Sequence, residues 1–437
     1  MSLQKIKPPV RLADPRNLGG RYALGLDFGT SGARAIAINT AGQIVAEAHQ
    51  SFSETVVGHA DLWQNSLWSL LESLPLGVRN HLGAITIDGT SGTVLLCDNR
   101  GKPVTEPLLY NDDRGRSIDL HSVAPLESPA QSATSSLAKV LWWWQTLPQD
   151  QLSGVAYLLH QADWLGYLLH GQLGVSDYHN ALKLGYDVGK LAYPSWLTCL
   201  PMATWFPHVK TPGATVGEIG AAIATRFEIP PDCLVKAGTT DSIAAFLASG
   251  AATPGEAVTS LGSTLVLKLL SRVRIDDPTA GIYSHRLGDL WLVGGASNTG
   301  GAVLRQFFTD EQLQSLSLQI NPGVSTGLNY YPLSCPGERF PINDPDYPPR
   351  LSPCPQDPVI FLQGLLEGIA QIEAQGYQRL AQLGATPATQ VYTAGGGAQN
   401  LGWQAIRARL LNLPVRSTDA AEAAYGAARL AQGVGVD

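Results

Sequence analysis

The chain has 437 residues, of which 44% are hydrophobic and 15% charged, and its formal net charge is −7. This length predicts two or three domains, and the composition is that of a folded globular protein rather than a disordered one. No basic cluster accompanies the negative charge, which argues against nucleic acid or an acidic membrane surface as a partner but leaves a small phosphorylated ligand open.

Neither metal-binding nor disulfide patterns are found in the sequence. The 5 cysteines are widely spaced, with no CxxC pair and no Cys/His ligand spacing. Residues 1–20 include several basic side chains but no apolar segment typical of a signal peptide. No run of about 18 apolar residues occurs. We therefore expect a loose tail over residues 1–20, no membrane span and a cytoplasmic location.

The first part of the chain reads as short strands and turns. Three strands are predicted to open a domain as a meander: Ala23–Asp27, Ala33–Asn39 and Ile44–Ala48. A helix is predicted over Asn65–Leu74. A further strand–turn–strand is predicted from Ala84–Asp88 and Thr93–Cys97.

The middle third is predicted to be mostly helical, with helices over Ser136–Thr146 and Gln161–His170. Three consecutive tryptophans, Trp142 to Trp144, face different sides of the first of these helices. Burial among helices is the better interpretation, and a ligand-stacking site is the alternative.

A second strand–turn–strand is predicted over Ala257–Leu270, with a Gly/Ser/Thr turn like that of the opening meander. This similarity suggests two related halves, each offering a turn to one ligand in a cleft between them. Cys335–Pro358 is rich in proline and is predicted to be a long surface loop. Three helices are predicted after it: Pro358–Leu383, Leu401–Leu411 and Ala420–Gln432.

Four turns rich in glycine and hydroxyl side chains follow predicted strands: Asp27–Gly32, Gly89–Gly92, Gly262–Thr264 and Gly395–Gly397. Backbone N–H groups freed by glycine, with hydroxyls beside them, are suited to binding phosphate. A Walker A loop is absent, and the Rossmann and nucleophile-elbow patterns each fail at their last position. The pattern that remains favours nucleotide binding by β-hairpin turns.

These motifs resemble those of the FGGY carbohydrate kinases. Asp27–Ser31 resembles the first phosphate motif of that family, and Gly262–Thr264 resembles its second phosphate loop. Thr393–Asn400 resembles the adenosine motif, and Gly238–Asp241 resembles the G-x-x-D that supplies the catalytic base. The resemblance runs from about Tyr22 to the C-terminus.

Supporting stretches follow the order of the same family. Asn111–Arg114 resembles its substrate-side W-x-D-x-R, with Tyr110 at the Trp position; the other matches are Ser136–Trp142, Asp177–Ala181 and Glu422–Ala428. The sequence departs from the family pattern at one place that bears on the identity of the substrate. Gly89-Thr90-Ser91-Gly92 replaces the M-H-G of xylulokinases and the Q-R of glycerol kinases.

The resemblance implies ATP and Mg²⁺ as cofactors and a small sugar as substrate. Phosphoryl transfer depends mainly on positioning and charge neutralisation, which glycine N–H groups, threonine hydroxyls and an acidic Mg²⁺ partner can supply. The implied residues are Asp241, Asp27 and Thr30 for catalysis; Asp27, Ser91, Asp112, Arg114 and Asp241 for the sugar; Gly29, Thr30, Gly262, Ser263, Thr264, Gly396, Gly397, Asn400 and Trp403 for the nucleotide; and Asp27 for Mg²⁺.

Two of these assignments have an alternative. Asp241 precedes the apolar helical run Ser242–Ser249, so it could simply cap that helix. Its G-x-x-D context beside a phosphate loop favours the catalytic base. Trp403, one turn after Asn400, could pack near the adenine or in the core.

The expected fold is α/β and actin-like, with two ribonuclease-H-like domains whose mixed sheets are flanked by helices around a cleft. A sugar-binding domain is predicted over residues 21–248 and a nucleotide-binding domain over 249–421, with residues 422–437 returning to the first. The expected function is transfer of the ATP γ-phosphoryl group to a ketopentose, D-ribulose before D-xylulose. A polyol kinase and an actin-like ATPase with a chaperone or assembly role are the alternatives, and the oligomeric state stays open between monomer and dimer.

Overall fold

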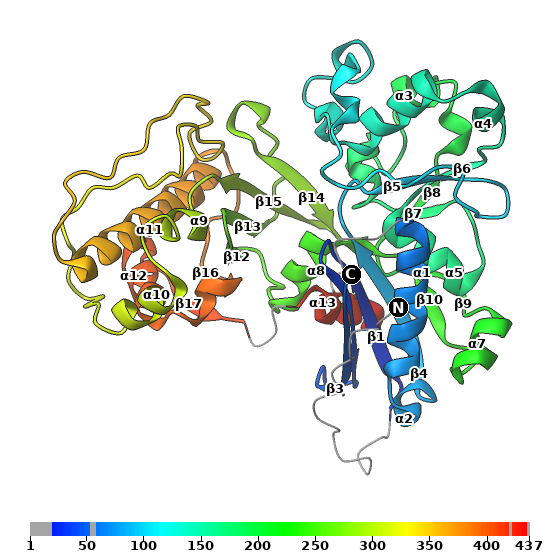
Figure 1. The fold of residues 1–437 in the computed structure, drawn as a ribbon, viewed down its shortest axis with the longest axis horizontal. Coiled ribbons are helices and arrows are strands. Elements are labelled where there is room, and N and C mark those ends of the chain that lie inside the picture. The colour runs from blue at the N-terminus through cyan, green and yellow to red at the C-terminus, as the bar shows by residue number, and fades with distance from the viewer. Residues whose placement is uncertain (1–19, 53–57, 419–421, 435–437) are drawn as a thin grey trace. The chain divides into compact units, whose positions relative to one another are not determined.

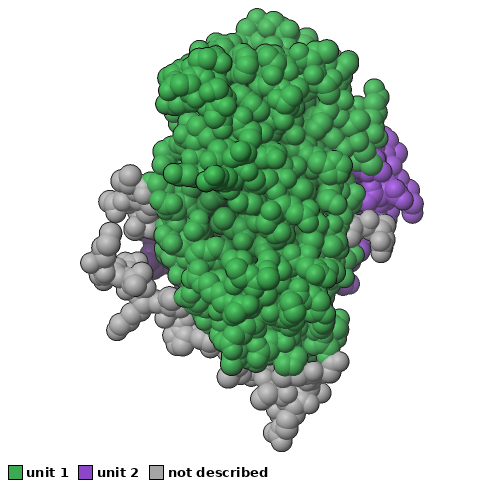
Figure 2. Space-filling view, turned by 90° about the vertical axis from the view of Figure 1, so that its right-hand side faces the viewer, with its two compact units in different colours: residues 1–248, 422–437 green, residues 249–421 purple. Residues whose placement is uncertain are grey.

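The computed structural model describes residues 20–52, 58–418 and 422–434. They belong to two compact units: unit 1 is residues 1–248 with 422–437, and unit 2 is residues 249–421 (Figures 1 and 2). Except for Gly20, the predicted N-terminal tail lies outside the described residues. Within the described ranges, no helix combines the length and the apolar character needed to cross a bilayer.

Unit 1 is built on a mixed seven-stranded sheet in the order β3-β2-β1-β4-β10-β9, with β11 also paired to β4. β1 pairs antiparallel with β2 and parallel with β4. The strands are β1 (Tyr22–Phe28), β2 (Gly32–Ile38), β3 (Ile44–Ser51), β4 (Leu82–Gly89), β9 (Thr215–Glu218), β10 (Leu234–Lys236) and β11 (Thr239–Thr240).

Helices cover both faces of this sheet (Figure 1). Leu24, Leu26 and Phe28 of β1 pack into a core with one set of helices: α1 (His59–Ser73), α5 (Gln161–His170) and α7 (Ala221–Phe227). The alternate residue Ala23 lies on the opposite face, with α13 (Ala423–Gln432), which itself packs on α8 (Asp241–Ala248). Because successive side chains of a strand point to opposite faces of the sheet, β1 contacts a different layer of helices on each face.

Two glycines allow the close approach of α13. A β-carbon on Gly25 of β1 would lie 2.0 Å from the carbonyl oxygen of Ala424. On the other side of the helix, a β-carbon on Gly426 would lie 1.8 Å from the carbonyl oxygen of Ala244. Any larger side chain at either position would force these elements apart, so this layer depends on both glycines.

The rest of unit 1 forms a separate core around Leu137, Trp143 and Met202. Its helices and strands are α3 (Ser136–Thr146), α4 (Gln149–Ser153), α6 (Ser195–Thr198), β5 (Val94–Cys97), β6 (Tyr157–His160), β7 (Val175–Asp177) and β8 (His208–Lys210). The short helix α2 (Leu76–Arg79) instead packs in the core of the main sheet through Val78. The two strands predicted around the Gly89–Gly92 turn are present as β4 and β5, and β5 pairs with β6. The middle third, predicted to be mostly helical, contains strands and short 3₁₀ turns besides its helices.

Unit 2 repeats the sheet pattern of unit 1. Its sheet has the order β14-β15-β13-β12-β16-β17, in which β12 pairs antiparallel with β13 and parallel with β16. The elements are β12 (Glu256–Leu261), β13 (Leu265–Ser271), β14 (Tyr283–Leu287), β15 (Leu290–Ser297), β16 (Gln390–Ala394), β17 (Val415–Ser417), α9 (Gly301–Leu304), α10 (Asp310–Ser317), α11 (Pro358–Gln382) and α12 (Leu401–Leu411). The predicted two α/β domains with mixed sheets are confirmed.

The proline-rich segment Cys335–Pro358 has neither strand nor helix among its described residues before α11 begins. It is not wholly at the surface, because Glu338 is 2% exposed and Phe340 is in the core of unit 2. Glu338 accepts hydrogen bonds from Ser297 Oγ at 2.6 Å and from the backbone N–H of Asn298 at 2.8 Å. These bonds attach the loop to the end of β15.

Candidate active site

Three carboxylates lie at one end of the unit 1 sheet. Asp27 and Asp88 are paired across the parallel strands β1 and β4. Asp88 is also paired with Thr239 of β11, two residues before Asp241. Since the carboxyl ends of parallel strands meet at the same edge of a sheet, this pairing brings Asp241 to the same edge as Asp27 and Asp88.

The environment of these carboxylates opposes their ionisation. Asp88 is fully buried, and neither of its oxygens has a hydrogen-bond partner among the described residues. Burial, with the neighbouring charges of Asp27 and Asp241, holds the pKa of Asp88 well above its ordinary value. Burial also raises the pKa of Asp27 to about 6, against the opposing effects of the neighbouring Asp88 carboxyl and of Arg34. Arg34 itself pairs with Glu422 at the start of α13.

Asp88 lies outside the motifs that predict the site residues. The signal was present, because an acidic residue at a strand end precedes the Gly89–Gly92 turn just as Asp27 precedes the Gly29–Gly32 turn. Only the strand pairing shows that these two acidic residues are neighbours.

Asp241 is the first residue of α8. Its Oδ1 accepts a hydrogen bond from the backbone N–H of Ser242 at 2.6 Å. Its side chain is only half-buried. The G-x-x-D aspartate is thus placed at a helix N-terminus where a substrate hydroxyl could reach it.

The first predicted phosphate turn connects β1 and β2. The backbone N–H of Gly29 donates to the carbonyl of Gly32 at 3.0 Å, and Thr30 is exposed at the tip. The hydroxyl of Thr30 is therefore accessible to a ligand.

The turn after β4 carries two hydroxyl side chains, of which one is hydrogen-bonded inside the protein and the other is accessible. Thr90 is buried, and its Oγ1 bonds to Thr93 Oγ1 at 2.5 Å and to Gln161 Oε1 at 3.0 Å. Ser91 is half-buried. Ser91 is thus the hydroxyl of this turn that a substrate could use.

Asp112 and Arg114 form a bidentate ion pair in which Arg114 Nη2 lies 2.6 Å from Asp112 Oδ2. Burial raises the pKa of Asp112, but the bonds from Arg114 outweigh this effect and the pKa is lowered overall. The guanidinium of Arg114 lies 4.8 Å from the ring centroid of Trp142. Of the three tryptophans, Trp143 is in the core, and Trp142 and Trp144 pack against that core.

Lys139 of α3 is fully buried beneath these residues. Its ammonium donates to the carbonyls of Gly92 at 2.7 Å and Leu109 at 2.6 Å. Burial lowers the pKa of Lys139 to about 7. Lys139 therefore joins the turn that carries Ser91 to the segment that precedes Asp112.

In unit 2, the predicted phosphate and adenosine motifs lie side by side. Because β12 and β16 are parallel and in register at Ser260 and Ala394, both loops begin at the same edge of the sheet. A β-carbon on Gly397 would lie 2.8 Å from Cβ of Leu261, the residue before the Gly262–Thr264 turn. A β-carbon on Gly396 would meet no atom within 4 Å, so this glycine borders open space.

Asn400 and Trp403 support the glycine loop. Asn400 caps α12 by accepting from the N–H of Trp403 at 2.9 Å, and its Nδ2 donates to Ser317 Oγ at 2.8 Å. Trp403 is 3% exposed and belongs to the core, with its ring against Gly397. In this structure Trp403 therefore packs in the core beneath the loop. A contact of Trp403 with adenine stays a prediction.

A buried network lies behind both loops. Arg407 pairs with Glu373 through Nε–Oε2 at 2.6 Å and Nη2–Oε1 at 2.7 Å. Glu373 also accepts from Thr259 of β12, and Arg407 donates to Thr393 of β16 at 2.6 Å. The ion pair thus joins the two strands that carry the nucleotide motifs.

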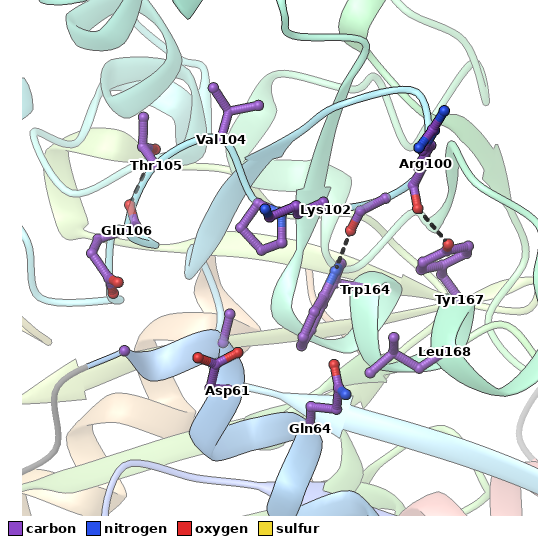
Figure 3. Close-up of a pocket in the computed structure, with 14 residues that line it drawn as sticks. Asp61, Gln64, Arg100, Lys102, Val104, Thr105, Glu106, Trp164, Tyr167 and Leu168 are labelled. Atoms are coloured by element: carbon purple, nitrogen blue, oxygen red, sulfur yellow. Dashed lines mark hydrogen bonds between the residues drawn. The ribbon is translucent and has the colours of Figure 1, made fainter.

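A cavity of about 550 Å³ lies elsewhere in unit 1 (Figure 3). Among its lining residues, Trp164 donates to the carbonyl of Gly101 at 2.9 Å and Tyr167 to that of Arg100 at 2.7 Å. The residues that line it include no predicted site residue and no carboxylate of the strand-end cluster. We therefore assign the site from the strand-end carboxylates and loops rather than from this cavity.

The described side chains contain no group of three or more His, Cys, Asp or Glu residues arranged to hold a metal. Mg²⁺ commonly takes one or two carboxylates, with phosphate oxygens and waters as its other ligands. A half-buried Asp27 beside two further carboxylates fits that smaller requirement, because a cation would relieve their mutual repulsion.

Residues 22–248 match the N-terminal domain of the FGGY family of carbohydrate kinases, and residues 257–432 match its C-terminal domain. The chain belongs to this family. It is an ATP-dependent sugar kinase, a phosphotransferase that acts on sugar hydroxyls.

Several kinases resemble most of the chain. A xylulose kinase from Streptomyces coelicolor is 27% identical, over 95% of this chain and 88% of its own length. A gluconokinase from Bacillus licheniformis is 20% identical, over 90% of this chain and 83% of its own. A rhamnulokinase from Yersinia pestis is 26% identical, over 73% of this chain and 69% of its own.

Solved structures show the same fold. The xylulose kinase of Rhodospirillum rubrum has a TM-score of 0.79 at 21% identity, with 94% of this chain and 89% of that chain covered. The glycerol kinase of Plasmodium falciparum with ADP has a TM-score of 0.80 at 16% identity, with 94% and 89% covered. The predicted actin-like fold of the sugar kinases is confirmed.

Proposed function

We propose that this FGGY kinase phosphorylates a ketopentose, with D-ribulose preferred over D-xylulose and both over glycerol. The observation that carries the proposal is the Gly89–Gly92 turn. It offers one accessible hydroxyl, that of Ser91, at the end of the strand that holds Asp88. Small hydroxyl-bearing side chains suit a short polyhydroxy chain, whose hydroxyls need partners once they are buried.

The relatives support a keto sugar without deciding which one. Xylulose kinases and a rhamnulokinase are among them, and both names denote enzymes of ketoses. The gluconokinase shows that the family also accepts a sugar acid. A polyol kinase stays the second candidate, and membership of a family of carbohydrate kinases disfavours the ATPase with an assembly role.

In the proposed reaction, a sugar hydroxyl oxygen attacks the γ-phosphorus of ATP while its proton passes to Asp241. The bond between the γ-phosphorus and the bridging oxygen breaks, and ADP leaves with that electron pair. We propose that the phosphates lie on Gly29–Thr30 and Gly262–Thr264 and the adenosine on Gly396, Gly397 and Asn400. Mg²⁺, held through Asp27, would neutralise phosphate charge.

The substrate is tested by measuring ADP release with D-ribulose, D-xylulose, glycerol and gluconate. A sugar-free reaction measures any uncoupled ATPase activity. The proposal expects the highest kcat/KM for D-ribulose. A kcat/KM for glycerol or gluconate well above that for both pentuloses would contradict it and leave the sugar-kinase assignment in place.

A further inference from the structure

The strand β11 leads the chain to the proposed base Asp241, and it is very short. It consists of Thr239 and Thr240, and in the described sheet it pairs with β4 alone. Asp241 follows directly as the first residue of α8. A strand of two residues with one partner strand has few ladder hydrogen bonds, so further contacts are needed to fix the position of Asp241.

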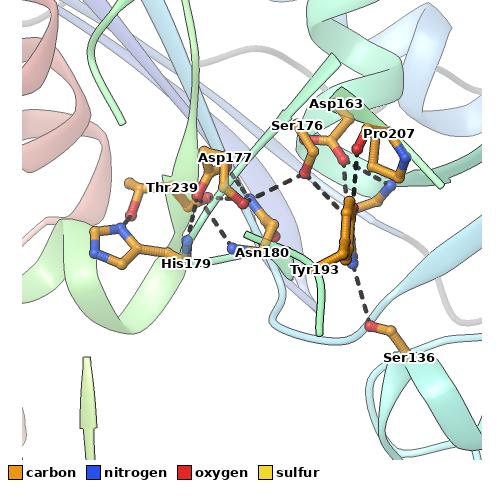
Figure 4. Close-up of polar contacts among 10 residues, drawn as sticks. Ser136, Asp163, Ser176, Asp177, His179, Asn180, Tyr193, Pro207 and Thr239 are labelled. Carbon is orange, nitrogen blue, oxygen red and sulfur yellow. Dashed lines mark hydrogen bonds and ion pairs between the residues drawn. The ribbon is translucent and has the colours of Figure 1, made fainter. Parts of the chain in front are cut away.

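Two buried side chains supply such contacts (Figure 4). Asn180 Nδ2 donates to the carbonyl of Thr239 at 3.1 Å, and His179 Nδ1 lies 2.8 Å from Thr239 Oγ1. His179, Asn180 and Thr239 are each at most 2% exposed. The turn that follows β7 therefore holds both the backbone and the side chain of Thr239.

This turn is itself fixed by Asp177, the last residue of β7. Asp177 Oδ1 accepts from the backbone N–H groups of His179 at 2.8 Å and Asn180 at 3.1 Å. Asn180 Nδ2 also donates to Asp177 Oδ2 at 2.6 Å. The proposed reaction has no role for the stretch Asp177–Ala181, although it matches a family motif. The structure shows this stretch as a buried support for β11.

Contacts on either side of Asp241 limit how the chain can move. Before it, a β-carbon on Gly238 would lie 2.3 Å from the carbonyl oxygen of Ile87 in β4, so the backbones are in close contact there. After it, α8 packs closely on α13 at Ala244 and Gly426. Thr239 lies between these two contacts, two residues before the carboxylate. A change in how Thr239 is held should therefore shift Asp241 more than the body of α8.

We propose that His179 is a positioning residue for phosphoryl transfer, holding Thr239 so that the carboxylate of Asp241 meets the sugar hydroxyl. This inference rests on the proposed role of Asp241 as the base. A general base must lie within hydrogen-bond reach of the proton that it takes, and a misplacement of about 1 Å can cost about 100-fold in rate. His179 acts through Asp241, so its loss should lower kcat and leave KM for ATP unchanged.

The test removes the bond between His179 and Thr239 from either side. Thr239→Val and His179→Leu abolish it, whereas Thr239→Ser keeps the hydroxyl and His179→Asn keeps a polar atom near the place of Nδ1. Ser136→Ala is the matched control, because it removes another buried hydroxyl, in α3, that lies 3.2 Å from Nε2 of the buried His160. The values measured are kcat, KM for ATP and the melting temperature, with whichever of the four compounds named above has the highest kcat/KM.

We expect Thr239→Val and His179→Leu to lower kcat about tenfold at unchanged KM for ATP. Thr239→Ser and His179→Asn should stay within about threefold of wild type. Ser136→Ala should lower the melting temperature, as loss of a buried hydrogen bond does, and leave kcat unchanged. Wild-type kcat in Thr239→Val and His179→Leu, or an equal loss of kcat in Ser136→Ala, would overturn the inference.

A double variant separates positioning of the base from general damage to the site. If the bond acts through the carboxylate, adding Thr239→Val to Asp241→Ala should change the residual kcat less than about twofold. A further tenfold loss in that background would overturn the inference, because the bond would then support the site in another way. Near-wild-type turnover of Asp241→Ala alone would instead overturn the proposed base, and this inference with it.

Discussion

Asp27 and Asp88 occupy paired positions on the parallel strands β1 and β4, so two carboxyl groups lie next to each other on one face of the sheet. Asp88 is the more deeply buried of the two, and burial is the main reason that both pKa values are raised. Burial therefore makes Asp88 the harder of the two carboxyl groups to ionise, and the half-buried Asp27 the easier one.

The first prediction is that Asp88→Asn raises stability, and more so at higher pH. The pKa of Asp88 in the folded protein lies above its ordinary value of 3.8. Its contribution to stability is therefore complete below about pH 4 and is lost as the pH rises through the folded pKa. Asparagine does not titrate, so the melting temperature of the variant should exceed that of wild type by more at pH 8 than at pH 5.

The expected excess at pH 8 is a few degrees, since about 1 kcal/mol shifts the melting temperature of a domain of this size by about 2–4 °C. Asp98→Asn, at a carboxylate whose pKa is lowered by backbone hydrogen bonds, is the control and should be destabilising near neutral pH. A difference between Asp88→Asn and wild type that does not change with pH would contradict the assignment.

The second prediction concerns activity at low pH. Asp27 must be ionised to accept hydrogen bonds from Mg²⁺-bound water or a sugar hydroxyl, and burial raises its pKa to about 6. We expect kcat/KM to fall as the pH drops below about 6, approaching tenfold per pH unit. The profile is measured at saturating Mg²⁺, with circular dichroism confirming the fold at each pH. A constant kcat/KM down to pH 5 would rule out this titration.

The third prediction is that Asp241→Ala lowers kcat by about 10²–10⁴, the range for a positioned general base. Its position at the start of α8 allows the carboxylate to be removed without emptying a core site, so ATP binding should be little changed. Turnover and nucleotide affinity are measured separately. Near-wild-type turnover would show that this aspartate serves only the helix.

Much of this architecture is predictable from sequence because turns and helices are local. The helices Ser136–Thr146, Gln161–His170 and Leu401–Leu411 have the predicted bounds. Helix α1 instead begins earlier, at His59, because Ala60 and Trp63 extend its buried face. The pairing of β5 with β6 was missed because it joins segments about 60 residues apart, and no local pattern encodes such pairing.

In the candidate site too, local motifs could be predicted from the sequence and long-range pairing could not. The glycine turns and the G-x-x-D are contiguous motifs, so the sequence indicates them. Asp88 has no such motif, because its place beside Asp27 depends on the register of β1 with β4. That register is a property of the fold rather than of a short segment of sequence.

The fourth prediction uses two adjacent glycines of the adenosine motif. Gly396→Ala adds a methyl group that meets no atom of the protein within 4 Å, whereas one at Gly397 would lie 2.7 Å from Trp403 Cζ3. We therefore expect Gly396→Ala to raise KM for ATP severalfold without lowering the melting temperature. Gly397→Ala should lower both ATP affinity and stability.

Gly77→Ala is the matched control, because its methyl group also meets nothing within 4 Å and it lies in α2 of unit 1. If Gly396→Ala leaves KM for ATP unchanged, the nucleotide does not approach this glycine. A complex with an ATP analogue then decides where it binds.

The last prediction tests the sugar side. Ser91→Ala should raise KM for the ketopentose about fivefold to tenfold, the effect of losing one hydrogen bond of about 1 kcal/mol to a buried hydroxyl, while KM for ATP stays the same. Thr90→Val removes the neighbouring hydroxyl, which is bonded to Thr93 and Gln161 inside the protein, and should lower the melting temperature instead. The two variants thus separate a ligand contact from a structural one. A Ser91→Ala enzyme with unchanged KM for both pentuloses would exclude this hydroxyl from the sugar site.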